Sequence, residues 1–272
     1  MKLSFRSAMI VLLAALSAPA VHAAPDAGAS TRTRIDQILA QRDRVREVDA
    51  VGLSYDGRHL AWIVSQHEQT RLELAAASGQ DAHAIAIPGD CAVKDLRWAR
   101  HSARLAILTR CKVEPANTKP IRGAVWLLDA QAGKPPRKLA DLDGYADGLQ
   151  WSADDRRIAF LYVAGATRLP AATASGNPRV GVIGEDEAQL EQVAAIPADG
   201  GKPRLLTPHG LYVYEFRWSP IGGRLAYVAA PPPGDDNWWT AKLYVQDADA
   251  GATPKLIVDP AKVQGPLHGM QI

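Results

Sequence analysis

The side chains of this sequence that could take part in chemistry are scattered, and few of them stand in a recognisable pattern. Seven histidines occur in the 272 residues, but none completes an H-E-x-x-H zinc motif, because Gln69-Thr70-Arg71 follows His67-Glu68. The sequence also lacks a Walker loop, a G-x-G-x-x-G motif and the G-x-S-x-G nucleophile elbow of a serine hydrolase. We therefore expect no cofactor, no bound metal and no catalytic residue in this chain.

Cys91 and Cys111 are the only thiols, and their spacing gives a more specific prediction. They are too far apart for a redox-catalytic C-x-x-C pair, which leaves two buried thiols or a disulfide. Trp98 and Leu105 flank the turn of a predicted hairpin, so the numbers of paired residues should add up to about 203, and those of the cysteines add up to 202. Opposed strand residues have Cα atoms about 4.5–5.5 Å apart, within reach of a disulfide, which the spacing therefore favours.

The stretch PPPGDDNWW, residues 231–239, is the first of two segments that could contact a ligand or a partner. A rigid proline run before two adjacent indoles is unusual for a plain turn, because loop tips are mostly polar. Trp238 and Trp239 either pack locally or contact a substrate or another domain, and in a strand one ring would point inward and the other outward. Asp235 and Asp236 offer oxygen ligands, but adjacent acidic residues alone are a weak signal for calcium.

The second segment is a long stretch of small residues that ends in an acidic run, with Glu185, Asp186 and Glu187. A run of like charges is typical of a solvated loop, so we expect these side chains to lie on the surface. Glu185 and Glu187 are also candidates for contact with a substrate or a partner domain.

A fifteen-residue pattern occurs four times and must form the framework that positions these groups. Its copies read AVGLSYDGRHLAWIV, DLRWARHSARLAILT, GLQWSADDRRIAFLY and EFRWSPIGGRLAYVA. They place Leu53, Trp98, Trp151 and Trp218 at the same position, at intervals of 45, 53 and 67 residues. Periods near 40 to 50 residues are typical of propeller blades, and the longer intervals indicate insertions in loops.

Each copy predicts a β-hairpin, because polar and apolar residues alternate before a turn and an apolar stretch follows it. A third strand and a short fourth one follow in most copies, for example AVWLLD and then PRKLAD. We therefore predict an all-β fold, a β-propeller with WD-like four-stranded blades at about 48–90, 91–143, 144–209 and 210–267. LHGMQI aligns with the start of a fifth blade at 268–272, so we expect an incomplete propeller. The repeated tryptophans should pack between blades.

Residues 1–23 have the layout of a secretory signal peptide, with Lys2 and Arg6 before an apolar run that is too short to span a membrane. We expect cleavage after Ala23 and a periplasmic or secreted protein. Residues 24–47 should form a leader with a short helix, because its apolar residues recur at helical spacing. Without Lys2 and Arg6, 29 basic residues (31 − 2) face 29 acidic ones, which argues against binding to nucleic acid or anionic lipid. Since no later apolar stretch is long enough to cross a membrane, we expect no membrane location after cleavage.

The signal peptide, the short helix and the W-S-x-D/G-G-R-L-A hairpins together resemble a known family. They look like the N-terminal propeller of secreted bacterial prolyl oligopeptidase-family serine peptidases, such as dipeptidyl- and acylaminoacyl-peptidases. The stretches AAIPADGGKPRLLTP (194–208) and YVYEFRWSPIGGRLAYVAAPPPGDDNWWTAKLYV (212–245) carry most of the likeness. Propellers of the periplasmic Tol system share the hairpin and are the second choice.

The peptidase resemblance implies a two-part enzyme, in which a C-terminal α/β-hydrolase domain carries Ser, Asp and His and the propeller restricts which peptides reach them. Those residues would lie beyond Ile272, so this chain would be the non-catalytic part. Some members hold a substrate amine with paired propeller glutamates, but Glu185 and Glu187 lack the aromatic neighbours of that pattern. The alternatives are a stand-alone periplasmic propeller that binds envelope proteins, and a truncated product without activity.

Overall fold

The computed structural model describes residues 27–42, 44–66, 69–113, 119–167, 169, 189–232 and 238–262. The chain divides into two compact units, Met1–Val45 and Arg46–Ile272. The first unit contains the short helix that the sequence predicts, α1 (Ala27–Arg42), whose apolar residues Ile35, Ile38 and Leu39 are exposed. No helix in the described part of the chain is long and apolar enough to cross a membrane. The signal peptide expected at 1–23 lies outside the described residues.

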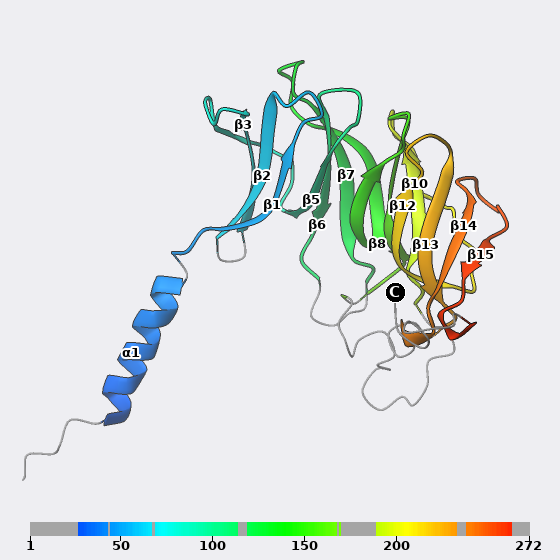
Figure 1. Cartoon of the computed structure of the whole chain (residues 1–272). Helices are drawn as coiled ribbons and strands as arrows, with labels where there is room; N and C mark the ends of the chain where they lie inside the picture. Colours follow the sequence, from blue (N-terminus) through cyan, green and yellow to red (C-terminus); the bar gives the residue numbers. More distant parts are fainter. Residues whose placement is uncertain are drawn as a thin grey trace, which may run out of the picture. The chain divides into compact units, whose positions relative to one another are not determined.

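The second unit consists of antiparallel strands in three hydrogen-bonded sheets (Figure 1). The first sheet contains β1 (Glu47–Leu53), β2 (His59–Gln66), β3 (Gln69–Ala76) and β4 (His83–Ile85). The middle sheet contains β5 (Ala92–Trp98), β6 (Arg104–Arg110), β7 (Arg122–Asp129), β8 (Arg137–Trp151), β9 (Arg157–Ala164), β10 (Gln192–Pro197) and β11 (Arg204–Leu205). The third sheet contains β12 (Tyr212–Trp218), β13 (Arg224–Ala230), β14 (Lys242–Asp247) and β15 (Lys255–Val258).

The strand β8 belongs to two blades, which is why the middle sheet has seven strands. Its first half pairs with β7 as far as Asp143, opposite Arg122, and its second half pairs with β9 from Gly144, opposite Ala164. The chain passes between blades at Gly144, where φ is +143° and a Cβ would collide with the carbonyl oxygen of Val163. The described strands thus form four four-stranded blades, in which β8 supplies the last strand of the second and the first strand of the third.

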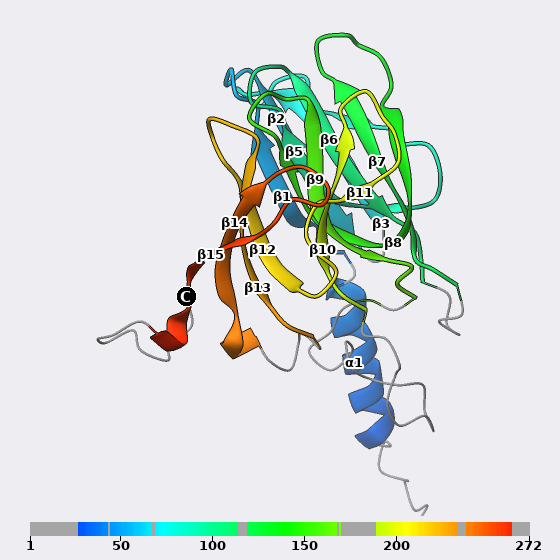
Figure 2. The same cartoon turned by 90° about the vertical axis from the view of Figure 1, so that its right-hand side faces the viewer.

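The blades follow one another as a fan, with the first at one end and the fourth at the other (Figures 1 and 2). This is the all-β propeller arrangement that the repeat predicts, because a propeller consists of four-stranded antiparallel blades that pack face to face. The strand expected at 268–272 lies outside the described residues.

Apolar clusters fill the three spaces between neighbouring blades. In each cluster the alanine of the apolar-Ala pair of one blade lies with the tryptophan of the next blade. Ala61, Ala106 and Ala159 are fully buried in this way, whereas the equivalent Ala226 of the fourth blade is partly exposed. A small side chain at this position leaves room for the large ring, which explains why the sequence repeats both residues.

Hydrogen bonds from the tryptophans tie each blade to the preceding one. The indole Nε1 of Trp98 donates to the carbonyl of Gly52 at 2.9 Å, and that of Trp151 donates to the carbonyl of Arg97 at 2.8 Å. Trp218 is buried at the equivalent place, but its Nε1 has no hydrogen-bond partner among the described residues. The tryptophans therefore pack between blades, and two of them are also fixed by a hydrogen bond.

Two further hydrogen bonds run in the opposite direction, from the residue before Trp98 and the residue before Trp151 to the next blade. Arg97 Nε donates to the carbonyl of Leu149 at 3.1 Å, and Gln150 Nε2 donates to the carbonyl of Phe216 at 2.7 Å. Leu53, which takes the tryptophan position in the first repeat, is different: its side chain is 56 % exposed. It packs against no preceding blade, because the first blade begins the described fan.

The turn after Trp151 explains how the sequence S-x-D ends the first strand of a blade. The hydroxyl of Ser152 donates to Asp154 at 2.6 Å and accepts from the backbone N–H of Arg157 at 2.9 Å. This bond to Ser152 is the main reason that the pKa of Asp154 is lowered from its ordinary value. The same contacts occur in the first blade, where Ser54 takes the place of Ser152.

The next residue of that turn, Asp155, connects the third blade to the second. Its buried carboxylate accepts the backbone N–H groups of Arg100 and His101 at 2.8 and 2.7 Å. Its φ of +54° lies in the left-handed region, which Asp tolerates better than most residues. The Asp155 side chain thus links the turns of these two blades, and His101 and Arg104 add side-chain hydrogen bonds to the carbonyls of Ala153 and Asp155.

Candidate binding surfaces

In all four blades the second strand ends and the third strand begins at the same edge of the propeller, because antiparallel strands reverse direction at every turn. We call this edge the loop face; it is the lower edge of the fan in Figure 1. Described residues on it include Cys111 after β6, Tyr145 at the start of the second half of β8, and Trp238 before β14. The loop face is the first candidate surface for ligands, since binding residues are concentrated on loops that a rigid scaffold positions.

Trp238 and Trp239 form a short 3-10 helix with Thr240 on the loop face. Their rings meet edge to face, with centroids 6.2 Å apart, and the two residues are 51 % and 60 % exposed. The expectation that one ring points inward was wrong, because the residues lie in a helical turn and not in an alternating strand. Two exposed indoles side by side, with ring planes at 77° to each other, offer an angled apolar surface to a partner.

The acidic candidates of the sequence analysis are not placed by the structure. Glu185 and Glu187 lie outside the described residues, and so do Asp235 and Asp236. In the described part of the chain, no group of three or more His, Cys, Asp or Glu side chains comes together in a way that could hold a metal ion.

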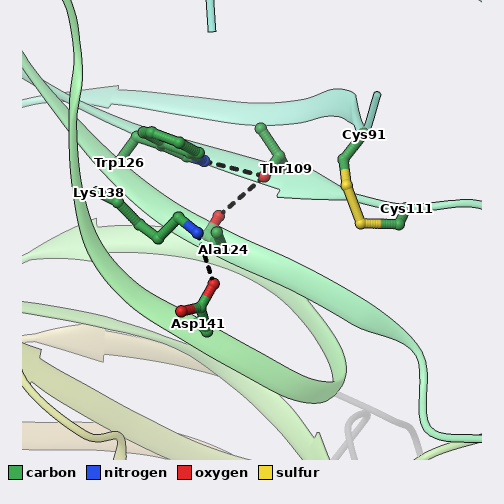
Figure 3. The surroundings of a disulfide bond; sticks show 7 residues. All are labelled: Cys91, Thr109, Cys111, Ala124, Trp126, Lys138 and Asp141. Atoms are coloured by element: carbon green, nitrogen blue, oxygen red, sulfur yellow. Dashed lines mark hydrogen bonds and ion pairs between the residues drawn. A yellow bond between two sulfur atoms is a disulfide. The ribbon is translucent and has the colours of Figure 1, made fainter. Parts of the chain in front are cut away.

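The two cysteines are joined by a disulfide on the loop face (Figure 3). Cys91 precedes β5 and Cys111 follows β6, and their Cα atoms are 4.0 Å apart. The residue numbers of paired positions add up to 203 near the turn and to 202 beyond a bulge between Val93 and Asp95. This bulge brings the cysteines directly opposite each other, and the bond closes the open end of the hairpin.

A cluster that the sequence analysis missed lies next to this hairpin. The guanidinium of Arg110 sits 5.1 Å from the ring centroid of Tyr145, whose hydroxyl donates to Asp147 at 2.9 Å. Burial, followed by the nearby Asp147 carboxylate, raises the pKa of Tyr145 to about 12. The raised pKa keeps Tyr145 protonated well above neutral pH, and its hydroxyl donates to Asp147. The arrangement suits recognition of a polar ligand, and its members come from two blades with no sequence motif to indicate them.

Comparison by sequence finds no match: no family model and no curated protein matches this chain. Comparison by structure finds similar folds at low identity. An acylaminoacyl peptidase from Pyrococcus horikoshii has a TM-score of 0.53 and 8 % identity, and the match covers 80 % of this chain and 33 % of that one. A prolyl endopeptidase has a TM-score of 0.52 and 11 % identity, and the match covers 85 % of this chain and 33 % of that one. An oligogalacturonate lyase in complex with manganese has a TM-score of 0.53 and 13 % identity, and the match covers 76 % of this chain and 52 % of that one.

These likenesses support the propeller fold. The chain spans about a third of the length of the two peptidases and about half of the lyase. The neighbours include peptidases of the kind that the sequence resembles, but also a lyase, and one fold can carry unrelated activities. At these identities the comparisons show the fold alone.

Proposed function

We propose that this chain is the non-catalytic N-terminal propeller of an exported serine peptidase of the prolyl oligopeptidase family. In this role it restricts the access of peptides to a C-terminal α/β-hydrolase domain. The observation that carries the proposal is the likeness of the blades to prolyl endopeptidases over 85 % of the chain, together with the peptidase-like stretches of the sequence. The lack of a G-x-S-x-G motif in the chain agrees with a division of labour in which the nucleophile is on another domain.

The loop face supplies the contacts that this function needs. The exposed indoles of Trp238 and Trp239 can stack on proline or aromatic residues of a peptide, or on the hydrolase domain. The hydroxyl of Tyr145 and the carboxylate of Asp147 offer polar contacts on the same edge. Catalysis would then take place elsewhere, and the propeller would select by shape and by these contacts.

Peptide binding can be measured directly by fluorescence anisotropy with labelled proline-containing peptides. We expect Trp238→Ala and Trp239→Ala to weaken binding about tenfold, because an aromatic contact contributes on the order of 1–3 kcal/mol. Ile221→Ala is the matched control, since Ile221 is 94 % exposed but lies in the turn between β12 and β13, on the opposite edge. Unchanged affinity in both tryptophan variants would rule out the indole contact.

Export is part of the proposal, and the Cys91–Cys111 disulfide supports it, because such bonds persist in oxidising compartments. We expect the protein in the periplasm or the medium, with a mature N-terminus at Ala24. Cell fractionation followed by N-terminal sequencing tests this. A cytoplasmic protein that keeps residues 1–23 would contradict it.

The reading frame beyond the codon for Ile272 tests the division into domains. We expect further blades, followed by a G-x-S-x-G motif and then Asp and His in that order. An immediate stop codon would favour the second function, a stand-alone periplasmic propeller that binds envelope proteins. The exposed tryptophan pair is the feature that supports this alternative.

A further inference from the structure

One arginine on the loop face lacks the hydrogen bonds that comparable arginines make. In the described part of the chain, Arg104, Arg110 and Arg157 each lie over an aromatic ring of the next blade. The guanidinium of Arg104 also donates to the carbonyl of Asp155 at 3.0 Å. That of Arg157 donates to the carbonyl of Ala248. The guanidinium of Arg110 makes no hydrogen bond or ion pair with any residue that the structure describes.

The position of the Arg110 side chain is fixed by its surroundings. Arg110 is the last residue of β6, where its backbone is paired with Ala92 on one side and Gly123 on the other. The next residue, Cys111, forms the disulfide shown in Figure 3. Tyr145, whose ring lies against the guanidinium, is half-buried and packs against a small cluster of buried apolar residues. The guanidinium is therefore in place before a ligand arrives, which lowers the entropy cost of binding.

A half-buried guanidinium with no acceptor among the described residues is suited to receive an anion. Charged groups that leave water are normally paired, because their desolvation is costly. Arg110 is only partly buried, and its nitrogen atoms are not among the fully buried atoms that lack a partner. A ligand can therefore reach its N–H groups from the loop face.

The acidic side chain of this cluster, Asp147, does not fill that role. Its Oδ2 accepts the hydroxyl of Tyr145 at 2.9 Å, and its Oδ1 accepts the backbone N–H of Gly148 at 2.7 Å. Burial and the Asp147 carboxylate raise the pKa of Tyr145, and the carboxylate of the buried Glu191 adds to this effect. Two carboxylates therefore lie near the ring, and they repel a ligand group with two negative charges more than a group with one.

A carboxylate is the ligand group that suits these surroundings best. It is planar and carries a single charge, and its two oxygens match the parallel N–H donors of a guanidinium. We propose that Arg110 binds a carboxylate of a peptide on the loop face, which is supplied by the C-terminus or by an acidic side chain. The inference rests on the proposed function in taking the ligand to be a peptide.

Three versions of one pentapeptide of alanine and proline, labelled at the N-terminus, test the proposal by fluorescence anisotropy. The first ends in a free carboxylate, the second in an amide, and the third in a glutamate whose C-terminus is an amide. We expect the purified protein to bind the free acid about tenfold more tightly than the plain amide, because hydrogen bonds between charged groups are strong. If the glutamate amide binds as tightly as the free acid, the site accepts any peptide carboxylate. If it binds as weakly as the plain amide, the site is specific for the C-terminus.

Variants of the cluster identify the group that holds the carboxylate. Arg110→Gln should abolish the preference for the free acid, whereas Arg110→Lys should keep part of it, because lysine retains the charge without the paired donors. Asp147→Asn should increase the preference, because it removes a nearby negative charge and keeps an acceptor for Tyr145. Arg122→Gln is the matched control, since Arg122 begins the neighbouring strand β7 but is paired with Asp143. It should leave the preference unchanged.

Circular dichroism verifies that each variant is folded, and Arg110→Lys and Asp147→Asn keep the test valid if Arg110→Gln unfolds. Equal binding of the free acid and the plain amide by the wild-type protein would overturn this inference and leave the proposed function standing. A preference that persists in Arg110→Gln would also overturn it, because another group would then hold the carboxylate. If none of the three peptides binds, the proposed function fails and this inference fails with it.

Discussion

Two tryptophans that have the same position in the third and fourth blades give the sharpest test of the blade interfaces. Trp151 and Trp218 are both nearly buried, at 5 and 8 % exposure. Each lies under an arginine of the preceding blade, with Arg104 and Arg157 at 5.1 and 5.0 Å from the ring centroids of Trp151 and Trp218. They differ in one respect: Trp151 donates a 2.8 Å hydrogen bond to the carbonyl of Arg97, and Trp218 has no such partner among the described residues.

Replacing each tryptophan with phenylalanine removes a similar volume and a similar arginine contact. In Trp151→Phe the carbonyl of Arg97 also loses the indole donor, a neutral hydrogen bond that contributes about 1 kcal/mol. In Trp218→Phe the substitution instead removes a buried donor that has no acceptor in the described part of the chain. We therefore expect Trp151→Phe to lower the free energy of unfolding by about 1–3 kcal/mol more than Trp218→Phe.

Urea unfolding, followed by far-UV circular dichroism, measures this difference by linear extrapolation. The comparison requires equal m values in the two variants, so that the transitions involve the same exposed surface. Equal losses of stability, or a larger loss in Trp218→Phe, would refute the view that the indole hydrogen bonds hold the blades together.

Three further predictions concern the same framework. Asp155→Ala should lower the free energy of unfolding by about 2–4 kcal/mol, because it removes two hydrogen bonds to a carboxylate. Asp155→Asn should cost less, since the amide keeps an acceptor and Asn tolerates positive φ. A larger loss in Asp155→Asn than in Asp155→Ala, measured by urea unfolding, would count against this. Replacing both Cys91 and Cys111 by serine should lower the free energy of unfolding by about 3 kcal/mol, because the disulfide closes a loop with a sequence separation of 20 residues and so restricts the unfolded chain. An unchanged urea midpoint would contradict this. The pKa of Tyr145 is raised to about 12 in the folded protein. Above pH 10 this tyrosine therefore loses its proton in the unfolded chain but keeps it in the folded protein. The free energy of unfolding should fall as the pH rises from 10 to 12. Tyr145→Phe should show a shallower fall in thermal melts over this range, and identical profiles would be inconsistent with the raised pKa.

Much of the fold could be predicted from the sequence, because the blade hairpin is a local pattern that occurs four times. Alternation, a turn and an apolar stretch define two strands, and the period defines the blade. The passage at Gly144 from one blade to the next within β8 has no such signal, because an extended strand continues through it. The bulge between Val93 and Asp95 brings the cysteines into register, and it also leaves no recognisable pattern in the sequence.

The candidate surfaces could be predicted only in part. The unusual composition around Trp238 and Trp239 indicated a segment whose indoles are exposed, but strand geometry gave the wrong orientation of the rings. The cluster of Arg110, Tyr145 and Asp147 depends on which side chains of two blades face each other, and this is set by packing and not by spacing. The exposure of Leu53 likewise depends on its blade being the first of the fan.

The central claim is that this propeller works with a serine hydrolase, and labelling with a fluorophosphonate probe tests it most directly. The probe reacts with activated serines, and antibodies raised against this chain would recover its complexes from extracts of cells that express it. The account predicts that the recovered material contains a labelled serine hydrolase, in the same polypeptide as the propeller. Recovery of the propeller with no labelled protein would contradict the account and leave a binding module as the better description.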